Sequence, residues 1–99
     1  MKGPGPTARD RRRRRAKRER EYKVVCAEVD ARDGDHCRAC GKYAGDFAHH
    51  HHLIFRSHGG LNSPSNLIKL CVKCHDLVHR RRLRVHGTTA DSVEFEAVE

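Results

Sequence analysis

The chain has 99 residues, a formal net charge of +8 at pH 7 and five cysteines. Because so short a chain buries little apolar surface, we expect one small domain that depends on a cross-link. No segment is apolar enough for a signal peptide or a membrane span, and we therefore expect a cytoplasmic protein without a membrane partner.

Residues 1–23 carry the whole net charge, because eleven lysines and arginines in this arm face three acidic residues. Two prolines and two glycines predict disorder over residues 1–8. A basic arm favours a polyanionic partner, since each cation that neutralises a phosphate releases condensed counterions. A solvated arm that only aids solubility is the alternative.

Residues 9–33 contain no helix breaker and predict a helix that ends near Gly34. Its second half has an apolar stripe, because Tyr22, Val25 and Val29 recur at helical spacing. The first half is almost wholly charged, so we expect it to be held less firmly than the second.

The remainder of the chain alternates turn signals with short apolar segments. Glycine, serine, asparagine and proline mark the loops, and short runs of alternating or helically spaced apolar residues mark the strands and the last helix. The expected order is a Cys-x2-Cys turn at 37–40, a strand from 46 into the histidines at 49–52, a loop over 56–66, a strand over 67–71 and a helix over 75–85. The residues after Gly87 give no clear signal.

Four cysteines form two Cys-x2-Cys pairs, Cys37 with Cys40 and Cys71 with Cys74. A tetrahedral zinc ion takes four thiolates at about 2.3 Å, and two tight turns deliver them in pairs. The spacing predicts a structural Zn²⁺ that contributes much of the folding free energy, with free thiols or disulfides as the alternative. Cys26 lies alone on the apolar helix stripe, which favours a core position.

His75 and His79 stand four residues apart on the predicted last helix, so their side chains leave one face a turn apart. Neighbouring helical residues point about 100° apart, so His75 should face away from the zinc bound by Cys74. The pair predicts a second metal ion, for which the histidines at 49–52 supply a third side. Taken alone, such a pair is more often ordinary helix surface.

The segments "HHLIFRSHGG", "NL" at 66 and 67, and "LCVKCHDLVH", after the lead-in "VDARDGDHCRACG", together resemble a known family. They are similar to the HNH (His-Asn-His) endonucleases of the small phage and bacterial type, in which four cysteines staple the nuclease motif. The resemblance covers about residues 24–80. It departs from the family pattern at Phe55, where a proline is common, and in having four histidines where two are usual.

The register of the histidine run follows from the residues after it. In the family a His-His pair is followed by three residues, often a basic residue, and later Gly-Gly, and this count lands on His51 and His52. His49 and His50 then belong to the incoming strand, where neighbours point to opposite faces. A register that uses His50 and His51 is the alternative.

The resemblance implies an α+β fold of the ββα-metal (His-Me finger) type, a hairpin packed on a helix around one catalytic ion. Here that fold would be small, stapled by zinc and preceded by a basic helix. The chain then divides into a basic, partly disordered or helical arm at 1–23, a nuclease domain at 24–86 and an acidic tail at 87–99.

Carried over by position, the resemblance makes His51 and His75 ligands of the catalytic ion, with His79 as an additional ligand. It makes His52 the general base, and Asn66 the residue that fixes the loop and thereby the base. Histidine suits proton abstraction, because its ordinary pKa of about 6.5 leaves the imidazole neutral at physiological pH. We expect hydrolysis with one metal ion, which binds a non-bridging and the leaving 3′ oxygen, and products with 5′-phosphate and 3′-hydroxyl ends.

The identity of the catalytic ion is less constrained than its site. Imidazole ligands favour Zn²⁺, Ni²⁺, Co²⁺ and Mn²⁺ over Mg²⁺ on affinity. Cellular abundance and the behaviour of the family favour Mg²⁺ or Mn²⁺.

The expected DNA contacts are basic. Arg56 stands where a family arginine often meets the DNA backbone, with a solvated loop charge as the alternative. Two runs of arginines would bind phosphates on either side of the site: Arg11, Arg12, Arg13, Arg14 and Arg15 in the arm, and Arg80, Arg81 and Arg82 near the end of the domain.

The resemblance predicts a metal-dependent endonuclease, a hydrolase that nicks or breaks double-stranded DNA. Phage packaging or replication proteins are candidate partners. A non-catalytic zinc module that binds nucleic acid is the alternative from another class. That alternative explains the cysteines and the charge but not the order of the histidines and the asparagine.

Overall fold

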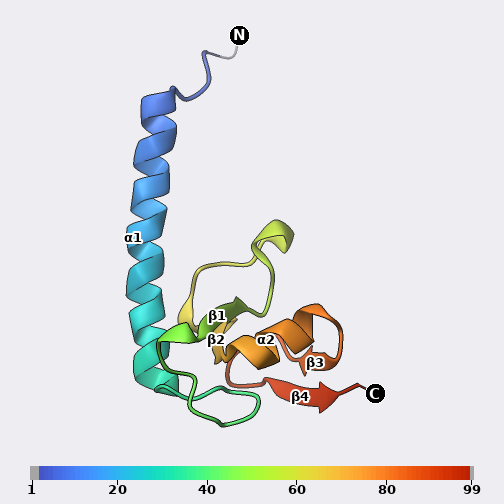
Figure 1. The fold of residues 1–99 in the computed structure, drawn as a ribbon. Helices are drawn as coiled ribbons and strands as arrows, with labels where there is room; N and C mark the ends of the chain where they lie inside the picture. Colours follow the sequence, from blue (N-terminus) through green and yellow to red (C-terminus); the bar gives the residue numbers. More distant parts are fainter. Residues whose placement is uncertain (1–2, 99) are drawn as a thin grey trace.

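The computed structural model describes residues 3–98 (Figure 1). Two α-helices, three short 3-10 helices and two small antiparallel sheets form the regular structure of these residues, so the predicted α+β class is confirmed. The strand predicted from residue 46 begins only at His49, because Gly45–Phe47 form a 3-10 helix. In chain order the elements are α1 (Ala8–Asp33), β1 (His49–His52), β2 (Leu67–Leu70), α2 (Val72–His79), β3 (Leu83–His86) and β4 (Glu94–Ala97). None of the helices in this part of the chain combines the length and apolar character needed to cross a membrane.

Helix α1 begins at a capping box and ends at a glycine. The Asp10 amide donates to the Thr7 hydroxyl at 3.1 Å, and the Thr7 amide donates to the Asp10 carboxylate at 3.2 Å. At the other end Gly34 has a φ of 67°, which a residue with a Cβ rarely adopts. The predicted helix and its end near Gly34 are thus confirmed.

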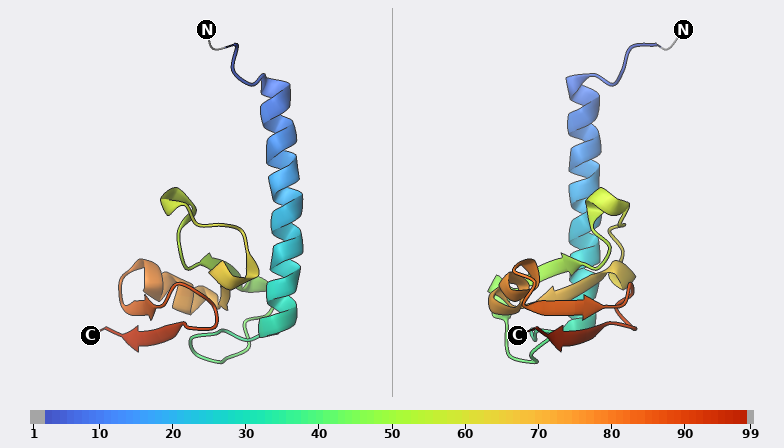
Figure 2. Two further views of the ribbon diagram at one scale, coloured as in Figure 1. Left: turned by 180° about the vertical axis from the view of Figure 1, so that it is seen from behind. Right: turned by 90° about the vertical axis from the view of Figure 1, so that its right-hand side faces the viewer.

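Only the second half of α1 packs on the rest of the protein, and the first half projects beyond it (Figures 1 and 2). Val29 is fully buried, and Tyr22 and Val25 are half-buried, as the apolar stripe predicted. Residues 3–7 have no regular secondary structure. The expectation of disorder over residues 1–8 also concerns residues 1 and 2, which lie outside the described residues.

Strands β1 and β2 form an antiparallel hairpin that lies between the two helices. On one face His49 and His51 stand opposite Leu70 and Ile68, and this face turns toward α2. On the other face, residues 50 and 52 stand opposite residues 69 and 67 and turn toward α1. All four residues of β2 are buried, because helices cover both of its faces.

The apolar core is small, as the chain length predicted. Its fully buried large side chains are Val29, Leu67, Ile68 and Leu70, and the sulfur-bearing Cys37 and Cys74 are buried beside them. A core of this size stabilises a fold only marginally, so a cross-link near it should contribute much of the stability of the domain.

Charged groups hold α1 on the hairpin. The Asp33 side chain is only 2% exposed and pairs with the guanidinium groups of Arg32 at 2.7 Å and Arg38 at 2.9 Å. On the same face the buried Lys69 ammonium pairs with the Asp30 carboxylate at 3.0 Å, and it donates to the Gly34 carbonyl at 2.9 Å. These contacts join the end of α1, the first cysteine turn and strand β2.

The helix predicted over residues 75–85 is wrong in its second half. Helix α2 ends at His79, and Arg81 turns the backbone into the left-handed region with a φ of 59°. The chain then continues as strand β3, because Leu83 and Val85 alternate with exposed residues and face a partner strand. The basic run at 80–82 therefore lies in the turn between α2 and β3 and not along a helix.

The segment after Gly87 carries structure that the sequence did not signal. Strand β4 pairs with β3, and the Ala90 amide donates to the Ser65 carbonyl at 2.7 Å. Ala90 is buried in the core, and Val93 and Phe95 pack beside it. The end of the chain thus covers the core next to the second cysteine pair.

Candidate functional site

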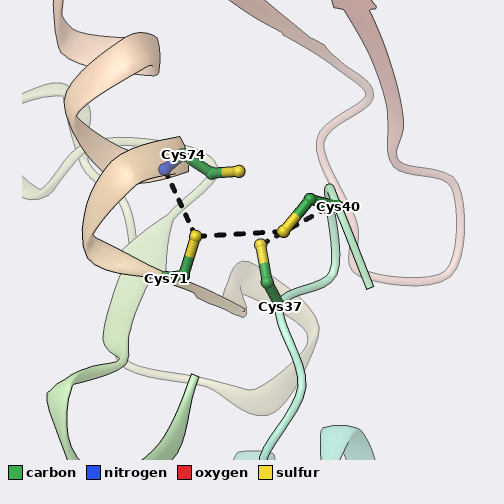
Figure 3. A group of neighbouring side chains, drawn as sticks. All are labelled: Cys37, Cys40, Cys71 and Cys74. Atoms are coloured by element: carbon green, nitrogen blue, oxygen red, sulfur yellow. Dashed lines mark hydrogen bonds between the residues drawn. The ribbon is translucent and has the colours of Figure 1, made fainter. Parts of the chain in front are cut away.

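The four paired cysteines form one cluster at the base of the hairpin (Figure 3). Cys37 and Cys40 come from the turn after α1, and Cys71 and Cys74 come from the start of α2. Their Sγ atoms all lie within 4.8 Å of one another. Four thiolates at about 2.3 Å from a tetrahedral zinc ion are about 3.8 Å apart, and the Cys40 and Cys71 sulfurs are separated by 3.9 Å. This set of donors fits a zinc ion, as the sequence predicted.

Backbone amides around this cluster favour the thiolate form. The amides of Ala39 and Cys40 donate to the Cys37 sulfur at 3.4 and 3.5 Å, and the Cys74 amide donates to the Cys71 sulfur at 3.4 Å. Burial raises the pKa of Cys37, but these amide contacts outweigh burial and lower that pKa to about 7. The first turn therefore favours the thiolate of Cys37, whereas burial and the neighbouring sulfurs raise the pKa of Cys74.

Cys26 lies apart from the cluster, on the helix stripe where the sequence placed it. Its side chain is half-buried near Tyr22, and burial raises its pKa. A protonated thiol in such a place behaves as a small apolar group.

Three imidazoles meet between strand β1 and helix α2. His51 comes from the strand, and His75 and His79 come from successive turns of the helix, with one nitrogen of each within 4.8 Å of the others. Burial, joined by repulsion from the other imidazoles, lowers the pKa of His51 to about 4. The pKa of His75 is also lowered, chiefly by burial. Neutral imidazoles are the form that binds a metal ion, so these residues fit a divalent cation.

His49 lies on the same side of the hairpin and contacts this cluster. Its ring meets the His75 ring edge to face at 4.5 Å between centroids, and the two Nδ1 atoms are in hydrogen-bond contact. The Nε2 atom of His75 faces Nε2 of His79 at 3.0 Å. His75 can therefore bind an ion through Nε2 while His49 orients its ring through Nδ1, a contact that the sequence did not predict.

His50 is turned away from the imidazole cluster. Its Nε2 contacts the Asp30 carboxylate at 2.7 Å, next to the Lys69 ammonium. In the structure it is therefore His51, and not His50, that meets the helix histidines.

His52 faces α1 but still lines the cavity next to the imidazole cluster. This cavity has a volume of about 410 Å³, and His51, Arg56, His75 and His79 line it as well. The fold thus brings the residues expected to bind the ion and the expected base to one open space.

Asn62 contacts His52 and was missed by the sequence analysis. Its Oδ1 atom lies 2.8 Å from Nε2 of His52 and accepts from Nε of Arg56 at 3.2 Å. Because arginine only donates, the atom between the two side chains is the amide oxygen, and Nε2 of His52 must donate as well. A neutral His52 then carries its proton on Nε2 and keeps the Nδ1 lone pair free.

Asn66 is buried and fixes the loop that carries Asn62. Its Oδ1 accepts from the Ile54 amide at 2.8 Å, and its Nδ2 donates to the carbonyls of Ile54 at 3.0 Å and Leu61 at 2.9 Å. Gly60 is required in this loop, because a Cβ there would stand 1.7 Å from the Ile54 carbonyl oxygen. Asn66 therefore acts on His52 through the loop and not by direct contact.

The expected DNA-binding arginines lie in three places. Arg56 is in the loop and stacks over the Tyr22 ring at 5.0 Å. The run at 80–82 occupies the turn after α2, where Arg80 pairs with Asp76 at 3.1 Å. The run at 11–15 lies in the first half of α1, and its last residue, Arg15, lines a second cavity between the helix and the loop.

A hairpin followed by a helix, with a thiol cluster at its base and imidazoles between strand and helix, defines a small zinc-stapled ββα-metal fold. The sequence model of the family described as HNH endonuclease matches residues 37–81, which include both clusters and Asn66. This part of the chain, a little under half of it, is therefore similar to the HNH endonuclease family. No curated protein matches the chain.

This similarity supports a nuclease-related function that involves nucleic acid. It also makes a zinc module without relation to nucleases the less favoured reading of the sequence. The reaction, its products and the roles of individual residues go beyond what the match itself carries.

Proposed function

We propose that the protein is a metal-dependent endonuclease that hydrolyses phosphodiester bonds in double-stranded DNA, by a nick or a double-strand break. The observation that carries this proposal is the cavity in which His52 adjoins the cluster of His51, His75 and His79. A base and a divalent cation on one open cavity are what hydrolysis of a phosphodiester requires.

His51, His75 and His79 would hold the catalytic cation, with Mg²⁺ or Mn²⁺ as the candidates in use and Ni²⁺, Co²⁺ or Zn²⁺ as further ones. When bound, the cation supplies positive charge that stabilises the charge developing on the phosphate and on the departing oxygen. Its three imidazole ligands are neutral, so they leave that charge available to the substrate. His49 would orient His75 through Nδ1, as an outer hydrogen-bond partner does.

His52 would take a proton from the attacking water at Nδ1. The proton on Nε2 stays on the ring and is donated in a hydrogen bond to the Asn62 oxygen. This hydrogen bond strengthens when the ring becomes positively charged. Attack of this water on phosphorus, with departure of the 3′ oxygen, leaves a 5′-phosphate and a 3′-hydroxyl. Asn62 and Asn66 act as positioning residues, the first on the ring and the second on the loop.

The basic residues would bind the phosphate backbone on both sides of the cavity. Arg56 lines the cavity itself, and the runs at 11–15 and 80–82 extend the positive surface along α1 and past α2. Such contacts give affinity without sequence information. Phage packaging or replication proteins remain candidate partners of the same proposal.

Supercoiled plasmid tests the proposed reaction. The zinc-loaded protein is incubated with Mg²⁺, Mn²⁺ or Ni²⁺, with and without a chelator, and the His52→Ala variant serves as the matched control. We expect nicked or linear plasmid with at least one ion, and little product with the variant. Intact plasmid with every ion, together with DNA binding, would instead favour the non-catalytic zinc module.

A further inference from the structure

A second cavity, of about 610 Å³, lies between helix α1 and the loop that joins β1 to β2. The loop rises beside the helix in both figures that show the whole fold (Figures 1 and 2). The helix contributes Arg15, Arg18 and Tyr22 to the lining, and the loop contributes Arg56 and Asn62. We call this cavity the helix-loop groove.

The charged residues of the helix-loop groove suit an anion. Three arginines line it, against the single acidic residue Glu19, and Tyr22 and Leu61 add apolar surface between them. Guanidinium groups bind phosphate through paired hydrogen bonds. The charge of the groove therefore complements a phosphodiester backbone.

The groove is continuous with the surroundings of the proposed base. Arg56 lines both cavities, and it stacks over Tyr22, whose ring lies parallel to the His52 ring at 6.1 Å. Asn62 lines the groove and contacts His52 directly. The two cavities therefore share a wall at Arg56, and a backbone that enters the active cavity can continue past this arginine into the groove.

We infer that the helix-loop groove binds the sugar–phosphate backbone of the DNA strand next to the cleaved bond, with Arg15 and Arg18 on one wall and Arg56 on the other. This inference rests on the proposed function and deepens it. It makes α1 a wall of the substrate site and not only a basic arm that attracts DNA from a distance.

The helix itself provides a matched control, because one face lines the groove and the opposite face does not. Arg15, Arg18 and Tyr22 are spaced i, i+3 and i+7 and share a face. Lys17 and Arg20 point roughly the opposite way at about 100° per residue. The two pairs carry equal charge on the same stretch of helix.

The test compares Arg15→Ala/Arg18→Ala with Lys17→Ala/Arg20→Ala. Affinity for a fluorescent DNA duplex is measured by anisotropy over a range of salt, in a His52→Ala background that leaves the DNA intact. Each lost phosphate contact reduces the slope of log K against log salt by about 0.9, so the groove pair should reduce it by about 1.8. A reduction no greater than that of the control pair would overturn the inference.

Two carboxylates on α1 give an independent test of opposite sign. Glu19 lines the groove, whereas Glu21 lies away from it and pairs with Lys17 at 4.0 Å. Glu19→Gln should tighten DNA binding, and Glu21→Gln should tighten it less. Equal effects of the two substitutions would count against a backbone in the groove.

Cleavage by the unmutated protein is measured separately, so that the two proposals fail independently. If the unmutated protein cleaves DNA but the two double variants change the salt slope equally, only the inference about the groove is refuted. A larger slope change for the groove pair without cleavage under any ion would refute the nuclease and leave the groove as a DNA site.

Discussion

The hydrogen bond between Asn62 and His52 should contribute directly to the rate of cleavage. Asn62→Ala removes the acceptor of the Nε2 proton, whose heavy atoms are 2.8 Å apart in a half-buried site. His52 makes this bond before the reaction and gains charge in the transition state, and only the gain in bond strength affects the rate. A neutral hydrogen bond is worth about 0.5–1.5 kcal/mol and one to a charged group about 1.5–3 kcal/mol, so the gain is about 1–1.5 kcal/mol. Since 1.36 kcal/mol is a factor of ten, the variant should cleave about 5- to 13-fold more slowly.

Plasmid nicking under the ion that gives the fastest reaction measures this loss, and a double-mutant cycle tests its origin. In a His52→Ala background, Asn62→Ala should have almost no further effect, because the group that it orients is gone. Asn62→Asp keeps an oxygen acceptor and should recover much of the rate. The reasoning is refuted if Asn62→Ala lowers the rate by the same factor with and without His52, since the residue would then act elsewhere.

Four further outcomes follow from the structure. Cys71→Ala should abolish cooperative unfolding, because the small core depends on the zinc cluster; circular dichroism melts check it. His75→Ala should lower the affinity for the catalytic ion, measured by titration calorimetry, by more than the roughly 10- to 100-fold that is typical for loss of an outer-shell partner. The zinc content should stay unchanged. Asp33→Ala leaves the partly exposed guanidinium groups of Arg32 and Arg38 without their buried carboxylate and should cost about 1.5–3 kcal/mol in denaturant unfolding. Burial and repulsion from His75 lower the pKa of His51 to about 4 in the folded domain. In the unfolded chain His51 has its ordinary pKa of about 6.5, so as the pH falls the unfolded chain takes up a proton on this residue before the folded domain does. The ion-free domain should therefore lose stability as pH falls from about 6.5 to about 4, and His51→Gln should lose less in parallel denaturant titrations.

The features that the sequence predicted well are those that local spacing determines. Two Cys-x2-Cys turns need only their own backbone to aim two sulfurs at one point, and His75 and His79 need only one helical turn. Helix α1 has its capping residues and its apolar stripe within the same segment. The thiol cluster and the α+β class were predictable for this reason.

The features that the sequence did not predict depend on contacts between distant segments. Asn62 reaches His52 only because Asn66 holds both ends of the loop and Gly60 allows the backbone to pass close to Ile54. The spacing over 83–86 suits a helix or a strand equally, and the choice is made by pairing with β4, eleven residues further along. Single-segment periodicity carries no information on either contact.

The hairpin explains why four consecutive histidines occur where the family commonly has two. Successive residues of a strand point to opposite faces, so alternate histidines serve different helices. His49 and His51 turn toward α2 and the imidazole cluster, whereas His50 and His52 turn toward α1. His50 ties the strand to Asp30 on α1 at 2.7 Å, and the His52 ring lies parallel to that of Tyr22 on the same helix. The run of imidazoles therefore links the two helices through one strand, and a displacement of α1 would move the proposed base relative to the ion site. Under the proposed function, we therefore expect the position of α1 to affect cleavage as well as DNA binding.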